Sequence, residues 1–207
     1  MDCGNVIHLP IIKVDDQDTP VIQVVPPPEL HLLLGPTNLM IEELGKVWGE
    51  CHAWLQSLHV TKEEYFGGNY EGNECRKILK KSNSLETRCP QEFQQFVKSL
   101  TTFNEVVASC FGENLSDDYV KKINSFKEAF LKLNISVTPK VHAVFFHIPE
   151  FCAFAGRGLG AYSEQTVESM HSEFKKCWDN FYVKDTDNDA YPDRLLSAVK
   201  SFNSMHL

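Results

Sequence analysis

Three long stretches of this sequence place an apolar residue at every third or fourth position, and this spacing limits the folds open to the chain. An interval of about 3.6 residues puts such side chains on one face of an α-helix, where they can be buried together. The stretches predict helices over residues 39–58, over 116–134 and from Ser163 onward. Their apolar positions are Met40, Leu44, Val47, Cys51, Leu55 and Leu58; Val120, Ile123, Phe126, Phe130 and Leu133; and Val167, Met170, Phe174, Cys177 or Trp178, and Phe181. The expected fold is therefore mainly α.

Capping residues, prolines and glycines predict the other helix boundaries. Gly35-Pro36 is expected to break or kink the start of the first helix. Asn73 is expected to cap a short basic helix, and a second helix is expected from Pro90 to Gly112. A third should begin at Thr138-Pro139, kink at Pro149 and end at Gly156. A final helix is expected from about Pro192 to the C-terminus.

Residues 1–28 differ from the rest, because short β-branched runs alternate with an acidic turn and end in Pro26-Pro27-Pro28. Prolines keep the residues before them extended. We expect an extended N-terminal arm over residues 1–28, with one or two edge strands. Residues 29–207 are expected to form a single helical domain, because 207 residues suit one large domain with an arm.

The composition excludes several broad classes of protein. With 43% hydrophobic residues, 14 Phe and 3 Trp, the chain has enough apolar surface to fold, which excludes wholesale disorder. The formal net charge of -8 disfavours binding of nucleic acid over the whole surface. The most apolar stretch, residues 141–155, contains two His, a Glu and a Pro and is too short to span a bilayer.

The cysteines and the N-terminus predict an intracellular, reducing compartment. The seven cysteines are an odd number with no Cys-x-x-Cys pair, which is typical of buried thiols and not of a disulfide framework. The opening Met1-Asp2-Cys3-Gly4 has neither the basic region nor the apolar region of a signal peptide.

Several short motifs indicate chemistry only weakly when each is taken alone. The glycine-rich segment 156–160 lacks the Gly-Lys-Ser/Thr ending of a phosphate loop and predicts a plain connection. The basic cluster Arg76–Lys81 suits either a phosphate contact or a solvated helix face. His142 and His147 are five residues apart, about 140° around an ideal helix, which favours buried or capping histidines over ligands of one metal.

Two glutamates begin the helix expected after Ser163. Glu164 and Glu168 are four residues apart and can face one direction, with His171 next to Glu168. Glutamates in a first turn usually interact favourably with the helix dipole, which is the simplest interpretation of this pair.

Taken together and in order, these pieces resemble the catalytic C-terminal region of the RAG recombinase and of Transib-type transposases. The matching pieces are His-x4-His and Pro-Glu in residues 142–150, a glycine turn at 158–160, Ser-Glu and Glu-Ser at 163–164 and 168–169, and a weaker match at 72–79. They keep the family's order between about residue 20 and residue 180, and this shared order is more specific than any one piece.

The resemblance implies that the helices correspond to the helical insertion and the C-terminal catalytic helix of an RNase H-like transposase core. It implies that His142 and His147 are zinc ligands; in the family, a Cys-x-x-Cys pair supplies the other two ligands of the zinc site. It further implies that Glu168 is the catalytic carboxylate, which in the family acts together with two aspartates. The spacing is one residue longer in this sequence, so Glu164 stays an alternative. A nuclear location and a role in DNA recombination are implied by the resemblance alone.

The family's two aspartates and its cysteine pair have no counterpart in this sequence. Two magnesium ions need a full set of carboxylates, so magnesium is expected only if a partner completes the site. Two histidines supply half of a four-ligand zinc site. We therefore expect no enzyme activity from the chain alone.

Three hypotheses follow. In the first, the chain is a transposase-derived helical fragment, inactive alone, that acts as a protein-interaction module with residual DNA contact. Its partner is another protein or a second copy of itself, and no membrane is involved. In the second, the chain supplies Glu168 in trans to a split DDE nuclease or transposase. In the third, it is an unrelated, acidic, all-helical adaptor protein.

Overall fold

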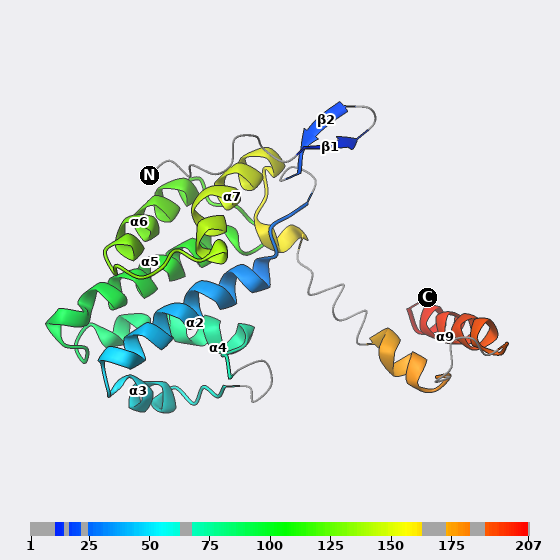
Figure 1. Cartoon of the computed structure of the whole chain (residues 1–207), viewed down its shortest axis with the longest axis horizontal. Coiled ribbons are helices and arrows are strands. Elements are labelled where there is room, and N and C mark those ends of the chain that lie inside the picture. The colour runs from blue at the N-terminus through cyan, green and yellow to red at the C-terminus, as the bar shows by residue number, and fades with distance from the viewer. Residues whose placement is uncertain are drawn as a thin grey trace. The chain divides into compact units, whose positions relative to one another are not determined.

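The computed structural model describes residues 11–14, 17–21, 25–62, 68–162, 173–182 and 189–206. The described chain is mainly helical, as the apolar spacing predicts (Figure 1). It divides into two compact units, residues 1–162 and residues 163–207. The sequence predicts one helical domain over residues 29–207, and the boundary between the units falls inside that range.

The N-terminal arm contains a small β-hairpin, seen at the blue end of the chain in Figure 1. Strands β1 (Ile11–Val14) and β2 (Gln17–Pro20) are antiparallel, and Ile11 lies opposite Pro20. One or two strands were expected in this arm, and two are present.

Helix α2 (Glu29–Val47) begins about ten residues earlier than predicted and runs through Pro36, so the helix does not break at Gly35-Pro36. The alternative expectation at this position, a kink, stays a prediction. Proline has no N–H to donate within a helix, which usually destabilises the turn. Here the buried Thr37 donates its hydroxyl to the Leu33 carbonyl at 2.8 Å, which adds a side-chain bond in the same turn. Leu32 and Leu33 are buried in the core, and this packing favours the helix despite the proline.

The helix predicted over residues 39–58 is two helices, α2 and α3 (Cys51–Ser57). Trp48 ends α2 in an extended conformation, with its backbone N–H bonded to the Leu44 carbonyl at 2.9 Å. Its side chain is only 6% exposed, so the chain turns where the indole enters the core. The apolar spacing continues across the break, which is why the sequence alone did not show it.

The other described elements of the first unit are four helices and three short 3-10 turns. These are α4 (Gly72–Lys81), α5 (Gln94–Cys110), α6 (Tyr119–Leu131), α7 (Pro139–Ala155), and turns at Ser82–Leu85, Gln91–Phe93 and Leu159–Tyr162.

Helix α7 begins and ends at the predicted residues. The Thr138 hydroxyl accepts the Val141 backbone N–H at 3.4 Å, and the following proline occupies the first turn, where no N–H is needed. Gly156 ends the helix with a left-handed φ of 63°, which glycine adopts at little cost.

The predicted buried stripe of α6 is correct in its middle and not at its two ends. Ile123, Phe126 and Phe130 are at most 1% exposed, whereas Val120, in the first turn, is 43% exposed. Leu133 is half-buried and lies beyond the helix, which ends at Leu131.

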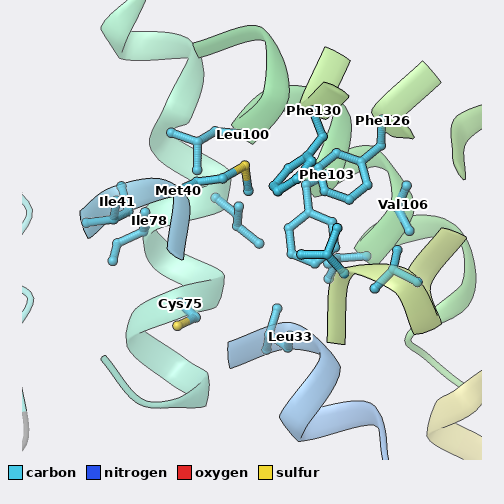
Figure 2. Close-up of a cluster of buried hydrophobic side chains, with 14 of the residues drawn as sticks. Leu33, Met40, Ile41, Cys75, Ile78, Leu100, Phe103, Val106, Phe126 and Phe130 are labelled. Atoms are coloured by element: carbon cyan, nitrogen blue, oxygen red, sulfur yellow. The ribbon is translucent and has the colours of Figure 1, made fainter. Parts of the chain in front are cut away.

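Phenylalanine rings from three helices form the centre of the core, and Figure 2 shows those of α5 and α6, Phe103, Phe126 and Phe130. Phe103 of α5 and Phe126 of α6 have ring centroids 4.7 Å apart, and Phe126 lies 5.5 Å from Phe145 of α7. Figure 2 also shows Met40 and Ile78 from α2 and α4 facing this cluster. Offset and edge-on ring pairs add about 0.5–1.5 kcal/mol each beyond burial of their area.

Helices α2 and α4 are also joined by polar contacts. The Asn38 side chain donates to the Tyr70 carbonyl at 2.9 Å and accepts the Tyr70 backbone N–H at 2.8 Å. Glu29, only 4% exposed, forms an ion pair with Arg76 of α4. A half-buried pair of this kind fixes the position of α4, because removal of either charge would leave the other without its partner.

The glycine-rich segment after α7 packs backbone against backbone on the turn after α5. The Gly158 N–H donates to the Glu113 carbonyl and the Gly160 N–H to the Gly112 carbonyl, each at 3.1 Å. A Cβ on Gly158 would lie 2.1 Å from the Gly112 carbonyl oxygen. The segment was predicted to be a plain connection, but the absence of side chains is what allows this close approach.

The second unit contains a helix over residues 173–179 and α9 (Tyr191–His206). Phe174 packs edge-on against Phe202 at 5.7 Å, and Trp178 packs against Tyr191 at 5.6 Å. The final helix thus starts where predicted. The expected first turns of the helix beginning at Ser163 lie outside the described residues.

We expect Gly158→Ala to lower the free energy of unfolding by about 1–3 kcal/mol, because the new methyl would overlap the carbonyl of the facing turn. Gly45→Ala is the matched control: Gly45 lies in α2 with nothing within 4 Å of the added Cβ. That variant should gain about 0.5–1 kcal/mol. Urea unfolding followed by circular dichroism measures both, and equal effects of the two substitutions would contradict the close backbone contact.

Candidate functional site on helix α7

Helix α7 carries the two histidines predicted as zinc ligands. Its inward face packs in the core through residues that include Val144, Phe145 and Ile148. The helix continues through Pro149 to Ala155, so both histidines lie on a continuous helix, on the side away from the core.

The His142 and His147 rings meet at the edge of this outward side. Their centroids are 5.2 Å apart with an interplanar angle of 65°, closer than their separation around an ideal helix suggests. His142 also stacks against Phe146 at 4.7 Å, and Lys127 of α6 lies 4.2 Å from the centre of the Phe146 ring. Partial burial, then His147 and then Lys127 lower the pKa of His142 below its ordinary value. These contacts therefore favour the neutral form of the His142 imidazole.

His147 differs from His142, because its Nδ1 atom is buried and makes no hydrogen bond within the described part of the chain. A buried ring nitrogen without a partner carries a desolvation cost of about 1–3 kcal/mol. This is the feature of the pair that ordinary packing explains least.

The described residues do not complete a zinc centre. In the ranges that the structure describes, no group of three or more His, Cys, Asp and Glu side chains comes together as metal ligands would. Cys152 is the nearest cysteine in sequence, but it is buried in the core on the opposite side of α7 from Phe146. The two imidazoles remain half of a four-ligand site.

The predicted catalytic residue Glu168 lies outside the described residues, as do Glu164 and His171. Whether Glu168 approaches the histidine pair therefore stays a prediction.

Half of the basic cluster on α4 makes contacts within the protein. Arg76 pairs with Glu29, and the Lys77 ammonium donates to the His59 carbonyl at 3.1 Å. Lys80 and Lys81 are exposed. The cluster thus offers a smaller positive surface to a phosphate than its sequence suggests.

An open groove of about 620 Å³ lies where α5 begins. Its polar residues are partly engaged already: Gln94 donates to the Cys89 carbonyl at 2.7 Å, and Gln95 donates to the Ala129 carbonyl at 2.6 Å. No histidine or cysteine lines it, so it offers neither a soft-metal ligand nor a thiol nucleophile.

The outward face of α7 is more apolar than an exposed helix face usually is. Phe146 and Phe154 are 38% and 60% exposed, and Tyr162, which packs edge-on against Phe151, is 42% exposed. Ala153 is exposed between them. Sequence reasoning missed this surface, although residues 141–155 hold more apolar side chains than one helix face can bury, and that excess was the available signal.

The described cysteines are not reactive groups. All six are buried free thiols, as predicted from their pattern. Burial raises the pKa of Cys75 and Cys110 to about 12 and that of Cys51 and Cys152 to about 11. Thiolate is the form that attacks substrates or binds metals, and it is suppressed at these positions.

No protein-family model matches this chain, and no curated protein or solved structure matches it either. Among the described helices, none is both long and apolar enough to cross a membrane. The likeness to the RAG and Transib transposases thus rests on the sequence motifs, and it stays a prediction.

Alkaline pH is expected to destabilise the fold through these thiols. Their folded-state pKa values lie above the ordinary value of 9.0, so the folded state binds more protons. The stabilisation is complete below about pH 9 and is lost as the pH rises through about 11 for Cys152 and about 12 for Cys110. Urea unfolding at pH 8, 9.5 and 10.5 should show this fall, and Cys110→Ala should show a shallower one. Iodoacetamide labelling of the native protein at pH 8 should spare these four thiols, and rapid labelling would contradict their burial.

Proposed function

We propose that this chain is a protein-interaction module that does not catalyse a reaction alone, and that it derives from the helical part of a RAG/Transib-like transposase core. One observation supports the interaction role above all: Phe146 and Phe154 are exposed on the outward side of α7, and Tyr162 of the turn that follows the helix is exposed as well. Single exposed apolar residues are normal, but two exposed Phe rings on one helix favour a binding surface.

Burial of this face would favour association. Full burial of an exposed Phe side chain contributes roughly 1.5–3 kcal/mol. Phe146 and Phe154 are 38% and 60% exposed, so covering both contributes about the value of one full side chain, which is part of the binding energy of a micromolar complex. Phe145 of α7 packs on Phe126, and Phe126 packs on Phe103, so the helix is held in place and little ordering cost opposes binding.

The charges around the face indicate the chemistry of the partner. Lys127 lies over Phe146, and Lys140 and Arg157 stand exposed near the two ends of α7. These cations fit an amphipathic helix whose apolar side is flanked by acidic residues. Glu150, on the same outward side, disfavours an acidic residue at the centre of the partner's apolar stripe.

The transposase origin is supported by the ordered motifs, with His142 and His147 in the positions of the family's zinc ligands. The missing aspartates support a loss of catalysis, since one carboxylate such as Glu168 cannot hold two magnesium ions. Lys80 and Lys81 are the residues that would make any residual DNA contact. The net charge of -8 opposes such binding.

We expect a synthetic amphipathic helix with leucines at i, i+3, i+4 and i+7 and glutamates on its flanks to bind the full chain with a dissociation constant on the order of 10 μM. Phe154→Ser should weaken binding at least tenfold, as fluorescence anisotropy would measure. Val47→Ser is the matched control, because Val47 is also exposed but lies on α2. A peptide with lysine in place of glutamate should bind more weakly. Equal losses in the two variants would exclude the α7 face as the binding surface.

We also expect the purified chain to leave labelled DNA intact in the presence of Mg²⁺, because the carboxylate set is incomplete. Gel analysis of nicking and strand transfer measures this. Cleavage that disappears in Glu168→Gln would overturn the proposal in favour of an intact DDE site.

A further inference from the structure

Helix α9 of the second unit has a packed apolar side and, beside it, a more exposed one. The packed side lies within the unit: Tyr191 and Phe202 contact Trp178 and Phe174, and Ala198 is completely buried. The more exposed side carries Leu195, Leu196 and Val199, which are 37%, 50% and 37% exposed. At 3.6 residues per turn these three lie within an arc of about 100° that begins next to Phe202 and turns away from the packed side toward Leu196. The helix therefore presents a second apolar stripe, which adjoins the packed side and is partly exposed.

The described residues of the second unit bury few apolar side chains among themselves. A small core of this kind becomes more stable when association covers further apolar surface. Among its described residues, Cys177 and Ala198 are the apolar side chains that are fully buried. Covering the second stripe of α9 would enlarge this core.

Two exposed charges indicate what covers the stripe. Asp193 and Lys200 are seven residues apart and so lie on the same flank of the stripe, next to Leu196. When two identical helices pack antiparallel about a two-fold axis, the same flank of each meets the other. Suppose that Leu195 of one copy lies opposite Val199 of the other. Asp193 and the Lys200 of the other copy are then offset by only about 1.5 Å along the helix axis.

A parallel pair would not have this match. Each residue would then lie at the level of the same residue in the other copy. Asp193 of one copy and Lys200 of the other would be about 10 Å apart along the axis. The charge pattern of α9 is therefore complementary to itself in the antiparallel arrangement only.

We propose that α9 is a self-association surface, through which two copies of this chain pair antiparallel and bury Leu195, Leu196 and Val199 between two Asp193–Lys200 ion pairs. The stripe is short, so the dimer is weak, with a dissociation constant on the order of 10 μM. This pairing does not depend on the α7 face, and it gives the interaction module two copies of that face.

The test is sedimentation equilibrium of the full chain over a range of about 1–200 μM, at low and at high salt. We expect a monomer–dimer equilibrium that weakens with salt. Asp193→Lys alone and Lys200→Asp alone should each weaken dimerisation at least tenfold, because like charges then meet. The double variant D193K/K200D should return to within about threefold of the original affinity, since both pairs are restored in reverse.

Matched controls separate pairing from misfolding and from net charge. Lys98→Asp makes the same charge change on an exposed residue of α5 and should leave dimerisation unchanged. Leu196→Glu should abolish dimerisation, while the fluorescence of Trp178, which packs against Tyr191, reports that the unit stays folded. A chain that is monomeric at 200 μM would overturn the proposal. So would a dimer that the double variant fails to restore, or one that Phe154→Ser removes and Leu196→Glu does not.

Discussion

Phe126 contacts the rings of Phe103, Phe130 and Phe145, and through them α5, α6 and α7 share one aromatic centre. The other features of the first unit depend on this packing. Because Val144, Phe145 and Ile148 point inward, the opposite side of α7 faces outward. Phe146 lies on that side, and the two half-buried histidines lie at its edges. The binding surface and the histidine pair are thus positioned by the same buried rings, and neither could move without repacking the core.

Capping residues and glycines predicted the ends of a helix correctly where the tertiary packing does not oppose them. Thr138 and Gly156 mark the ends of α7 because a cap hydroxyl and a left-handed glycine have few other uses. The same reasoning failed at Pro36 and at Trp48. At Pro36 the burial of neighbouring leucines outweighs the lost hydrogen bond, and at Trp48 a large side chain turns the backbone into the core. Both outcomes are set by tertiary contacts that no short stretch of sequence contains.

The candidate site was predictable in part. Sequence order drew attention to His142 and His147, and the structure brings their rings together. Sequence did not indicate that Phe146 and Phe154 face outward, since an apolar helix gives no sign of which side its neighbours cover. Nor did it indicate that Arg76 is engaged by Glu29, because those residues are far apart in the chain. The sequence shows that residues 141–155 hold more apolar side chains than one helix face can bury. Only the packing of the helices shows which of these side chains are exposed.

The backbone contact between Gly158 and Gly112 has a mechanical consequence. The segment 158–162 is the last part of the first unit before the chain continues into the second. A pulling force applied through the second unit would reach the hydrogen bonds of Gly158 and Gly160 before it reached the last turn of α7. Both bonds join the segment to the turn that links α5 and α6. Tension would therefore be passed to the interior of the helical body before it loaded α7.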